Sequence, residues 1–152
     1  ELSFADAGNI ASAYKTAVIW GVQNGIITGY NDNTFRPNQN ISRAQMATFM
    51  YRYLKNVAQY DFGDVSAVSF SDADSIAAPY KDAVNAIVSA GIMNGLTTTL
   101  FVPNGTANRG MAATVSGATI YRLTILNSLE MHMKMQCSRF LAVKYIRTQI
   151  MM

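Results

Sequence analysis

The stretch GIITGYNDNTFRPNQNISRAQ, residues 25–45, recurs 66 positions later as GIMNGLTTTLFVPNGTANRGM, residues 91–111. Extending the comparison to residues 4–49 gives 19 identities in 46 positions without a gap, far more than unrelated segments share. The chain therefore contains an internal duplication. In such arrays each copy is a supersecondary unit that must pack on a neighbour to bury its apolar face.

Each copy is predicted to fold as a helix, a loop and a second helix. Apolar and small residues follow the spacing of one helical face in the first helix: Ile10, Tyr14, Ala17, Val18 and Gly21. The second helix has a similar face: Met46, Phe49, Met50, Tyr53 and Leu54. Turn-forming residues crowd the segment between them, so a loop is expected there. The predicted fold class is all-α, a small bundle of tandem helix–loop–helix repeats, with short extended segments allowed in the loops.

Glycine and polar residues mark the ends of these helices. Gly25 and Gly91 stand where a left-handed residue would close the first helix of each copy. Ser42 and Gln45 form a capping-box sequence at the start of the second helix. In the second copy Asn108 takes the cap position but a methionine replaces the glutamine, so only half of the box is expected there.

The net charge of +3 does not describe the repeats. As far as Arg122 the chain carries equal numbers of basic and acidic residues, and the whole excess lies in the tail beyond it. A neutral body has no basic surface that would release counterions from a phosphate backbone, so no nucleic-acid partner is expected. No apolar run approaches the roughly 20 residues of a membrane span, so no membrane span is predicted.

Residues for catalysis and metal binding are scarce. The single histidine, His132, and the single cysteine, Cys137, both lie in the tail, which leaves no serine–histidine–aspartate triad and no zinc site in the repeats. The segment Asn31-Asp32-Asn33 lacks the alternating ligands and the terminal glutamate of a calcium loop. We therefore expect no enzyme activity, no metal and no cofactor.

The motifs of both copies resemble those of the S-layer homology domain. In order and spacing the first copy matches all five: Phe4-x-Asp6, Ala17-Val18, Gly25-Ile-Ile-x-Gly29, Phe35-x-Pro37 and Ser42-Arg-Ala-Gln45. The second copy keeps all but the last, where it reads Asn108-Arg109-Gly110-Met111. The resemblance assigns residues 1–56 to a first repeat, 57–69 to a linker and 70–126 to a second repeat.

This resemblance implies a function. Such domains are helical bundles, usually of three repeats, that hold exported proteins on bacterial cell walls by binding secondary wall polysaccharides, often pyruvylated, without a covalent bond. The chain would then be a non-catalytic anchoring module, extracellular and on the wall of a Gram-positive-type bacterium. Since only two repeats are present, we expect a third repeat or the rest of a parent protein to be missing.

Four charged residues are candidate ligand contacts. Arg43 and Arg109 stand in the first turn of a helix, where the dipole disfavours a cation. A guanidinium beside free helix-start amides would suit a carboxylate such as a pyruvyl ketal. Asp6 and Asp72 are candidates to accept hydrogen bonds from sugar hydroxyls.

Uncharged residues complete the candidate site. Gly29 and Gly95 have no Cβ, so a ligand can approach their backbone closely. Tyr14 and Tyr80 follow the position at which the family often has a tryptophan, and either is a candidate to replace it in stacking on a sugar. Trp20 has no counterpart in the second copy and is expected to be a packing residue.

Alternative interpretations stay open. Arg43 could simply pair with Asp6, and Arg109 with Asp72, which would pin each loop to its helix with little net stability. Such a pair could also orient the arginine for a ligand. At the level of function, the alternatives are a structural or self-assembly module of a surface layer that binds no sugar, and the anchor of a surface enzyme whose catalytic domain is absent.

Residues 127–152 differ from the repeats in composition. Glycine and proline are absent, whereas five of the nine methionines and the only histidine and cysteine lie there. Three interpretations are a basic helix, a segment on a membrane surface and sequence read in the wrong frame. The abrupt change in composition favours the last, so no function is inferred from this tail.

Overall fold

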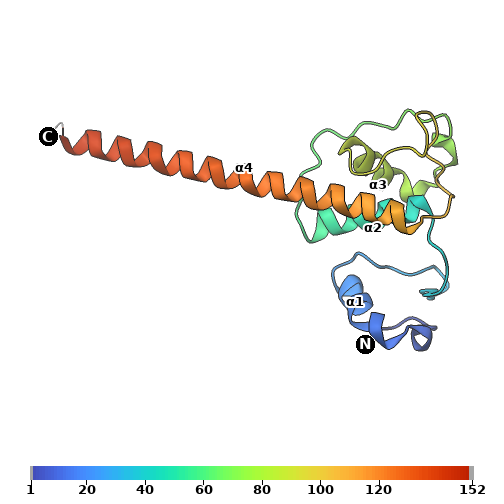
Figure 1. Ribbon diagram of the computed structural model, residues 1–152. Coiled ribbons are helices and arrows are strands. Elements are labelled where there is room, and N and C mark those ends of the chain that lie inside the picture. Colours follow the sequence, from blue (N-terminus) through green and yellow to red (C-terminus); the bar gives the residue numbers. More distant parts are fainter. Residues whose placement is uncertain (1, 151–152) are drawn as a thin grey trace. The chain divides into compact units, whose positions relative to one another are not determined.

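Helices form all the regular structure in the computed structural model of the protein (Figure 1). They are η1 (Ala7–Asn9), α1 (Ser12–Gln23), α2 (Arg43–Asn56), η2 (Ala73–Ser75), α3 (Ala78–Ser89) and α4 (Arg109–Ile150). The structure describes the backbone of residues 2–150 and the side chains of residues 2–129, 131–133 and 135. Within that part there is no strand, only an isolated antiparallel bridge between Ser42 and Thr106. The predicted all-α class is confirmed.

The duplication is visible in the element boundaries. The elements η2, α3 and α4 each begin 66 residues after η1, α1 and α2. Two compact units make up the chain, residues 1–116 and 117–152. The first holds both loops, the helices α1, α2 and α3, and the start of α4. The second is the continuation of α4, and no described helix is long and apolar enough to cross a membrane.

Local signals set the helix ends as predicted. The Ser42 hydroxyl accepts a hydrogen bond from the Gln45 amide at 3.2 Å, and the Gln45 side chain accepts one from the Ser42 amide at 2.8 Å. The Asn108 side-chain oxygen accepts a hydrogen bond from the Met111 amide at 2.9 Å, which is the expected half of the box. Gly25 and Gly91 adopt φ of 66° and 64°, the left-handed conformation that ends α1 and α3.

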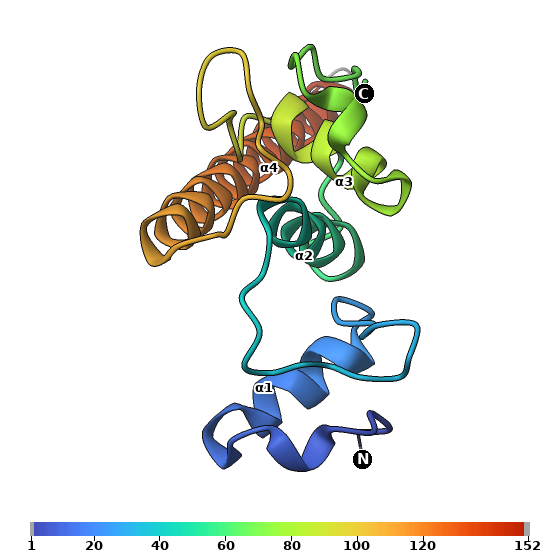
Figure 2. The ribbon, with the colours of Figure 1, turned by 90° about the vertical axis from the view of Figure 1, so that its right-hand side faces the viewer.

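The main helix pair joins the two repeats. Figures 1 and 2 both show α2 of the first repeat running beside α3 of the second, with α1 set apart from that pair. Small and aliphatic residues are buried on both helices: Ala44, Met46, Ala47 and Leu54 on α2, and Ala83, Val84, Ala86 and Ile87 on α3. Fully burying a side chain such as Leu54 or Ile87 contributes about 1.5–3 kcal/mol.

The apolar face predicted for the first helix is only partly buried. Ile10 and Val18 are buried, but Tyr14 is 66% exposed and Ala17 is exposed as well. Trp20, expected to be a packing residue, is 46% exposed. On α3 the equivalents of Ala17 and Trp20 are buried alanines, and α3 is the helix against which α2 packs. The expectation that Trp20 is a packing residue was wrong, because in the described part of the chain no helix covers α1 as α2 covers α3.

The predictions for the tail fall mostly on side chains that lie outside the described residues. The backbone of residues 127–150 continues α4. The assignment of these residues to a wrong reading frame stays a prediction.

Candidate ligand-binding cleft

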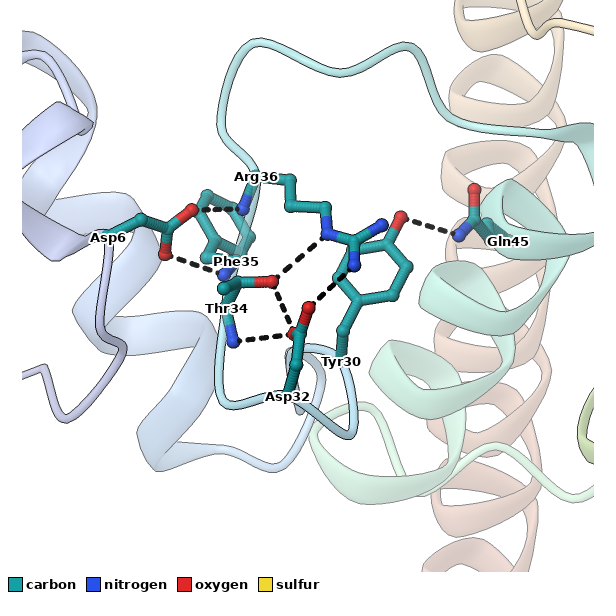
Figure 3. Close-up of polar contacts among 7 residues, drawn as sticks. All are labelled: Asp6, Tyr30, Asp32, Thr34, Phe35, Arg36 and Gln45. Carbon is teal, nitrogen blue, oxygen red and sulfur yellow. Dashed lines mark hydrogen bonds and ion pairs between the residues drawn. The ribbon is translucent and has the colours of Figure 1, made fainter.

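Each aspartate of the F-x-D motif holds a loop of its own repeat. The Asp6 carboxylate accepts hydrogen bonds from the amides of Phe35 and Arg36 at 2.8 and 2.7 Å (Figure 3). Asp72 does the same for Phe101 and Val102, at 2.9 and 2.7 Å. The Phe35 amide is the main cause of the lowered pKa of Asp6. Donation from the Phe101 amide likewise lowers the pKa of Asp72.

These carboxylates stabilise a strained backbone. Arg36 has φ of 58° and Val102 has φ of 57°, a region that is unfavourable for residues with a Cβ and especially for β-branched valine. Each aspartate binds the amide of the strained residue and that of the residue before it. Asp6 and Asp72 are therefore positioning residues for the two loops, with lone pairs left over for a further donor.

The two candidate glycines are needed for packing inside each loop. A Cβ at Gly29, where φ is 70°, would come within 2.5 Å of the Phe4 ring. At Gly95 it would come within 2.6 Å of the Phe70 ring. The phenylalanine of each F-x-D motif thus packs against the second glycine of each G-I-x-x-G motif.

The two candidate arginines have different surroundings. Arg43 is 4% exposed, and its side chain donates to the carbonyls of Phe101 and Asn94, both at 2.7 Å. Its own amide donates to the Gly105 carbonyl at 2.8 Å, so this helix-start amide is engaged. Arg109 is exposed. In the described part of the chain neither arginine pairs with an aspartate, so the ion pairs of the alternative interpretation do not form.

A cleft of about 620 Å³ lies between the first loop, α2 and the start of α3. Two predicted site residues, Gly29 and Tyr80, line it. The lining does not include the other six, and Gly95 lines a separate, more open hollow. We call this space the cleft; its other polar and aromatic walls include Tyr30, Asp32, Phe35, Arg36, Gln39, Gln45, Phe49 and Arg52.

One wall of the cleft is a closed polar network (Figure 3). Arg36 donates to Asp32 at 2.7 Å and to the Thr34 hydroxyl at 3.0 Å, and its guanidinium lies 4.1 Å from the centre of the Tyr30 ring. Hydrogen bonds from Thr34 and then Arg36 lower the pKa of Asp32 to about 2. The bond to Asp32 in turn raises the pKa of Arg36. Gln45 of α2 donates to the Tyr30 hydroxyl at 3.0 Å.

The second cation of the cleft has no acidic partner. Arg52 projects from α2 and donates to the Ile26 carbonyl at 3.2 Å and to the Thr28 hydroxyl at 3.1 Å. Among the described residues the only salt bridge is that of Arg36 with Asp32. No group of three acidic, histidine or cysteine side chains suited to a metal ion occurs in that part either. The cleft thus keeps one uncompensated positive charge, at a half-buried guanidinium.

Sequence reasoning missed both arginines of the cleft. The repeat comparison passes over Arg36 because valine stands at the equivalent position, and Arg52 because alanine stands 66 residues later. The fold supplies the missing information, since it brings Arg36 of the first loop and Arg52 in the third turn of α2 to the same cleft. The available signal was that Arg36 lies inside the Phe35-x-Pro37 motif and that the pair Tyr51-Arg52 recurs as Tyr121-Arg122.

Comparison with known proteins agrees with the motifs. A family model described as S-layer homology domain matches residues 3–47 and 69–113. The chain is 33% identical over 112 residues to Exoglucanase XynX of Acetivibrio thermocellus, and 36% identical over 112 residues to the Surface-layer 125 kDa protein of Lysinibacillus sphaericus. It is 33% identical over 102 residues to the Amylopullulanase of Thermoanaerobacterium thermosulfurigenes.

These matches span most of this chain but little of the relatives. They cover 74%, 72% and 67% of the chain, and 10%, 9% and 5% of the three proteins in the same order. The two family matches together take up more than half of the chain and coincide with the two copies of the duplication. The chain therefore belongs to the S-layer homology domain family, whose members anchor surface proteins to the cell wall.

Proposed function

We propose that the cleft binds an anionic polysaccharide of the cell wall without a covalent bond. In this proposal the chain is a non-catalytic anchoring module on the wall of a Gram-positive-type bacterium, and the polymer is a secondary wall polysaccharide with carboxylate groups such as pyruvyl ketals. The small share of the enzyme relatives that the chain matches supports an anchoring rather than a catalytic part.

The unpaired guanidinium of Arg52 carries the proposal. Asp32 neutralises the first arginine of the cleft, whereas no described acid pairs with Arg52. A guanidinium presents several donors in a planar fork, and the two bonds of Arg52 to backbone and hydroxyl oxygens both come from Nη1, which leaves donors for a carboxylate. Partial burial strengthens that contact because the local dielectric is lower than in water.

The remaining walls suit a sugar chain. Tyr30, Phe49 and Tyr80 supply aromatic surface, and side-chain amides such as Gln39 and Gln45 supply donors and acceptors for hydroxyl groups. A concave site with apolar walls and a few placed polar groups is the usual form of a binding site. Its volume, about 620 Å³, is within the range of small-ligand sites.

The residues singled out by the repeat have distinct parts in this proposal. Gly29 and Tyr80 contact the ligand, whereas Asp6 holds the loop that carries Arg36. Arg43 and Asp72 act on the second repeat, away from the ligand. The anion contact is thus assigned to Arg52 rather than to the two motif arginines.

The test is co-sedimentation with purified wall sacculi, before and after acid extraction of the secondary polymer. The protein should pellet with untreated sacculi and stay in solution with extracted ones. Arg52→Gln should weaken binding about tenfold, as expected when the partner of a carboxylate is removed. Arg52→Lys should bind with intermediate strength, since it keeps the charge but loses the fork.

Two controls separate binding from folding. Arg122→Gln removes an equal charge from an exposed residue that does not line the cleft, and should bind as the natural protein does. Circular dichroism and urea midpoints show whether Arg52→Gln, which also loses two internal hydrogen bonds, remains folded. A folded Arg52→Gln protein that pellets as well as the natural one would overturn the assignment.

A further inference from the structure

The joint between the two repeats has a plug and a socket. The plug is the start of α2: the amides of Arg43 and Ala44 donate to the carbonyls of Gly105 and Pro103 at 2.8 and 3.0 Å. The Arg43 side chain reaches two further carbonyls, those of Asn94 and Phe101, both at 2.7 Å. The socket therefore consists of four carbonyls in the second loop together with the face of α3 that carries Ala83 and Ala86.

The second repeat carries a plug of its own that is not inserted. Arg109, the equivalent of Arg43, is exposed at the start of α4, and so are the equivalents of the buried Ala44, Ala47 and Thr48. Two of these are the same residue in both copies, Ala113 and Thr114. Among the described residues, the amides of Arg109 and Gly110 donate to no acceptor.

The first repeat carries a socket that is not filled. The carbonyls equivalent to the four socket acceptors belong to Thr28, Phe35, Pro37 and Gln39, and none of them accepts a hydrogen bond within the described part of the chain. On α1, Ala17 is exposed where its equivalent Ala83 is 3% exposed. The exposed face of α1 is therefore the repeat equivalent of the α3 face that packs against α2.

Side-chain size is complementary across the two free surfaces. Trp20 is larger than its equivalent Ala86 on the socket face of α1. On the plug face, α4 has smaller residues than α2: Gly110 replaces Ala44, and Ala112 replaces Met46. A larger side chain on the socket face and smaller ones on the plug face are a combination that close packing favours.

We propose that a second copy of this chain docks head to tail, with the Arg109 plug of one molecule in the first-repeat socket of the next. The internal joint is the template for this interface, since each free surface is the repeat equivalent of one of its halves. Such a contact is heterologous: each open oligomer keeps one free plug at one end and one free socket at the other until a ring closes, so association continues beyond the dimer.

The socket shares its loop with the cleft, because Thr28, Phe35, Pro37 and Gln39 also line that space. Self-association is therefore measured without polysaccharide. A failure of head-to-tail docking then says nothing against the proposed polysaccharide binding. A failure of polysaccharide binding likewise says nothing against the docking.

Sedimentation velocity of the full chain over a wide concentration range, under reducing conditions, tests the proposal. The natural protein should form dimers and larger species. Arg109→Glu should disable the plug, because it reverses a charge in the contact, and Ala17→Arg should disable the socket, because it inserts a charge there. Each variant should associate at least about tenfold more weakly than the natural protein. Both positions are exposed, so both variants should keep the natural circular dichroism spectrum.

The decisive arm mixes the two variants. Each retains one intact half of the interface, so an equimolar mixture should form a one-to-one dimer and stop there. Arg122→Glu, a matched charge reversal at another exposed arginine, should associate like the natural protein. A natural protein that stays monomeric up to about 1 mM, an Arg109→Glu protein that associates normally, or a mixture that forms no dimer would each overturn the proposal.

Discussion

The guanidinium of Arg43 lies 4.9 Å from the centre of the Phe101 ring, and its Nε donates to the carbonyl of the same residue at 2.7 Å. The two residues are 58 positions apart and belong to different repeats. Burial lowers the pKa of Arg43, and the attraction of the Asp72 carboxylate, which forms no ion pair with it, opposes that shift. Carbonyl oxygens and an aromatic face make the direct contacts with the charge. This contact ties the repeats into one unit, and it makes Arg43 structurally unlike its sequence equivalent Arg109.

Replacing Arg43 with methionine should lower the free energy of unfolding by about 2–3 kcal/mol. The carbonyls of Phe101 and Asn94 would lose their donor, and an unsatisfied buried polar group costs about 1–3 kcal/mol. Arg109→Met is the matched control and should change stability by less than about 0.5 kcal/mol because Arg109 is exposed. Urea unfolding at low protein concentration measures both, and equal midpoints would contradict the role of Arg43.

Stability should fall in acid through Asp6 and Asp72. The loop amides lower the pKa of both carboxyls in the folded state relative to the ordinary value of 3.8. Their contribution is therefore complete above pH 3.8 and is lost as the pH falls through the lowered values. Thermal unfolding between pH 6 and pH 2 measures the loss. The Asp72→Asn protein should be less stable at pH 6 and should lose less on acidification.

The control for that series is Asp74→Asn. Asp74 is exposed and holds no loop amide, so its replacement should leave the acid profile unchanged. If Asp72→Asn and Asp74→Asn have the same profile, the loop amides do not stabilise the folded state through Asp72.

Gly29→Ala should destabilise the protein by at least about 1–2 kcal/mol. The left-handed backbone costs a residue with a Cβ about that much, and the new atom would also clash with the Phe4 ring. Gly8→Ala is the control, because a Cβ there meets nothing within 4 Å. The same loss of thermal stability for both variants would mean that Gly29 is not required by the loop.

Ser42→Ala should cost about 1 kcal/mol, the usual effect of losing an N-cap. It removes the acceptor of the Gln45 amide and leaves the rest of the plug unchanged. Ser12→Ala, at the exposed first turn of α1, should have little effect because no cap hydrogen bond involves that side chain. Chemical denaturation of the two variants gives the difference, and a null result for Ser42→Ala would argue against the capping box.

Much of the local structure could be predicted. Helix ends follow from hydrogen bonds between residues a few positions apart, as at Ser42 and Gln45, so a short stretch contains all the information. The duplication predicted equivalent elements in both copies, and these begin 66 residues apart. The family motifs led to the S-layer homology domain, which the family match confirms.

The candidate site was less predictable. Gly29 and Tyr80 line the cleft as candidate residues should, but Arg36 and Arg52 were not singled out. The sequence suggests the motif aspartates as ligand contacts, whereas in the structure they accept hydrogen bonds from loop amides. A carboxylate that closes a loop and one that binds a sugar look alike in sequence because both roles require only a hydrogen-bond acceptor.

By itself the sequence determined the helix–loop–helix unit, its caps, its duplication and its family, since these depend on neighbours along the chain. Only the tertiary structure decided that α2 packs on the helix of the next repeat, that Arg43 is buried while Arg109 is exposed, and that Arg52 opens into a cleft. The physical reason is that burial depends on which surface covers a residue. In a duplicated chain, identical motifs differ in their surroundings according to whether a neighbouring repeat is there to cover them.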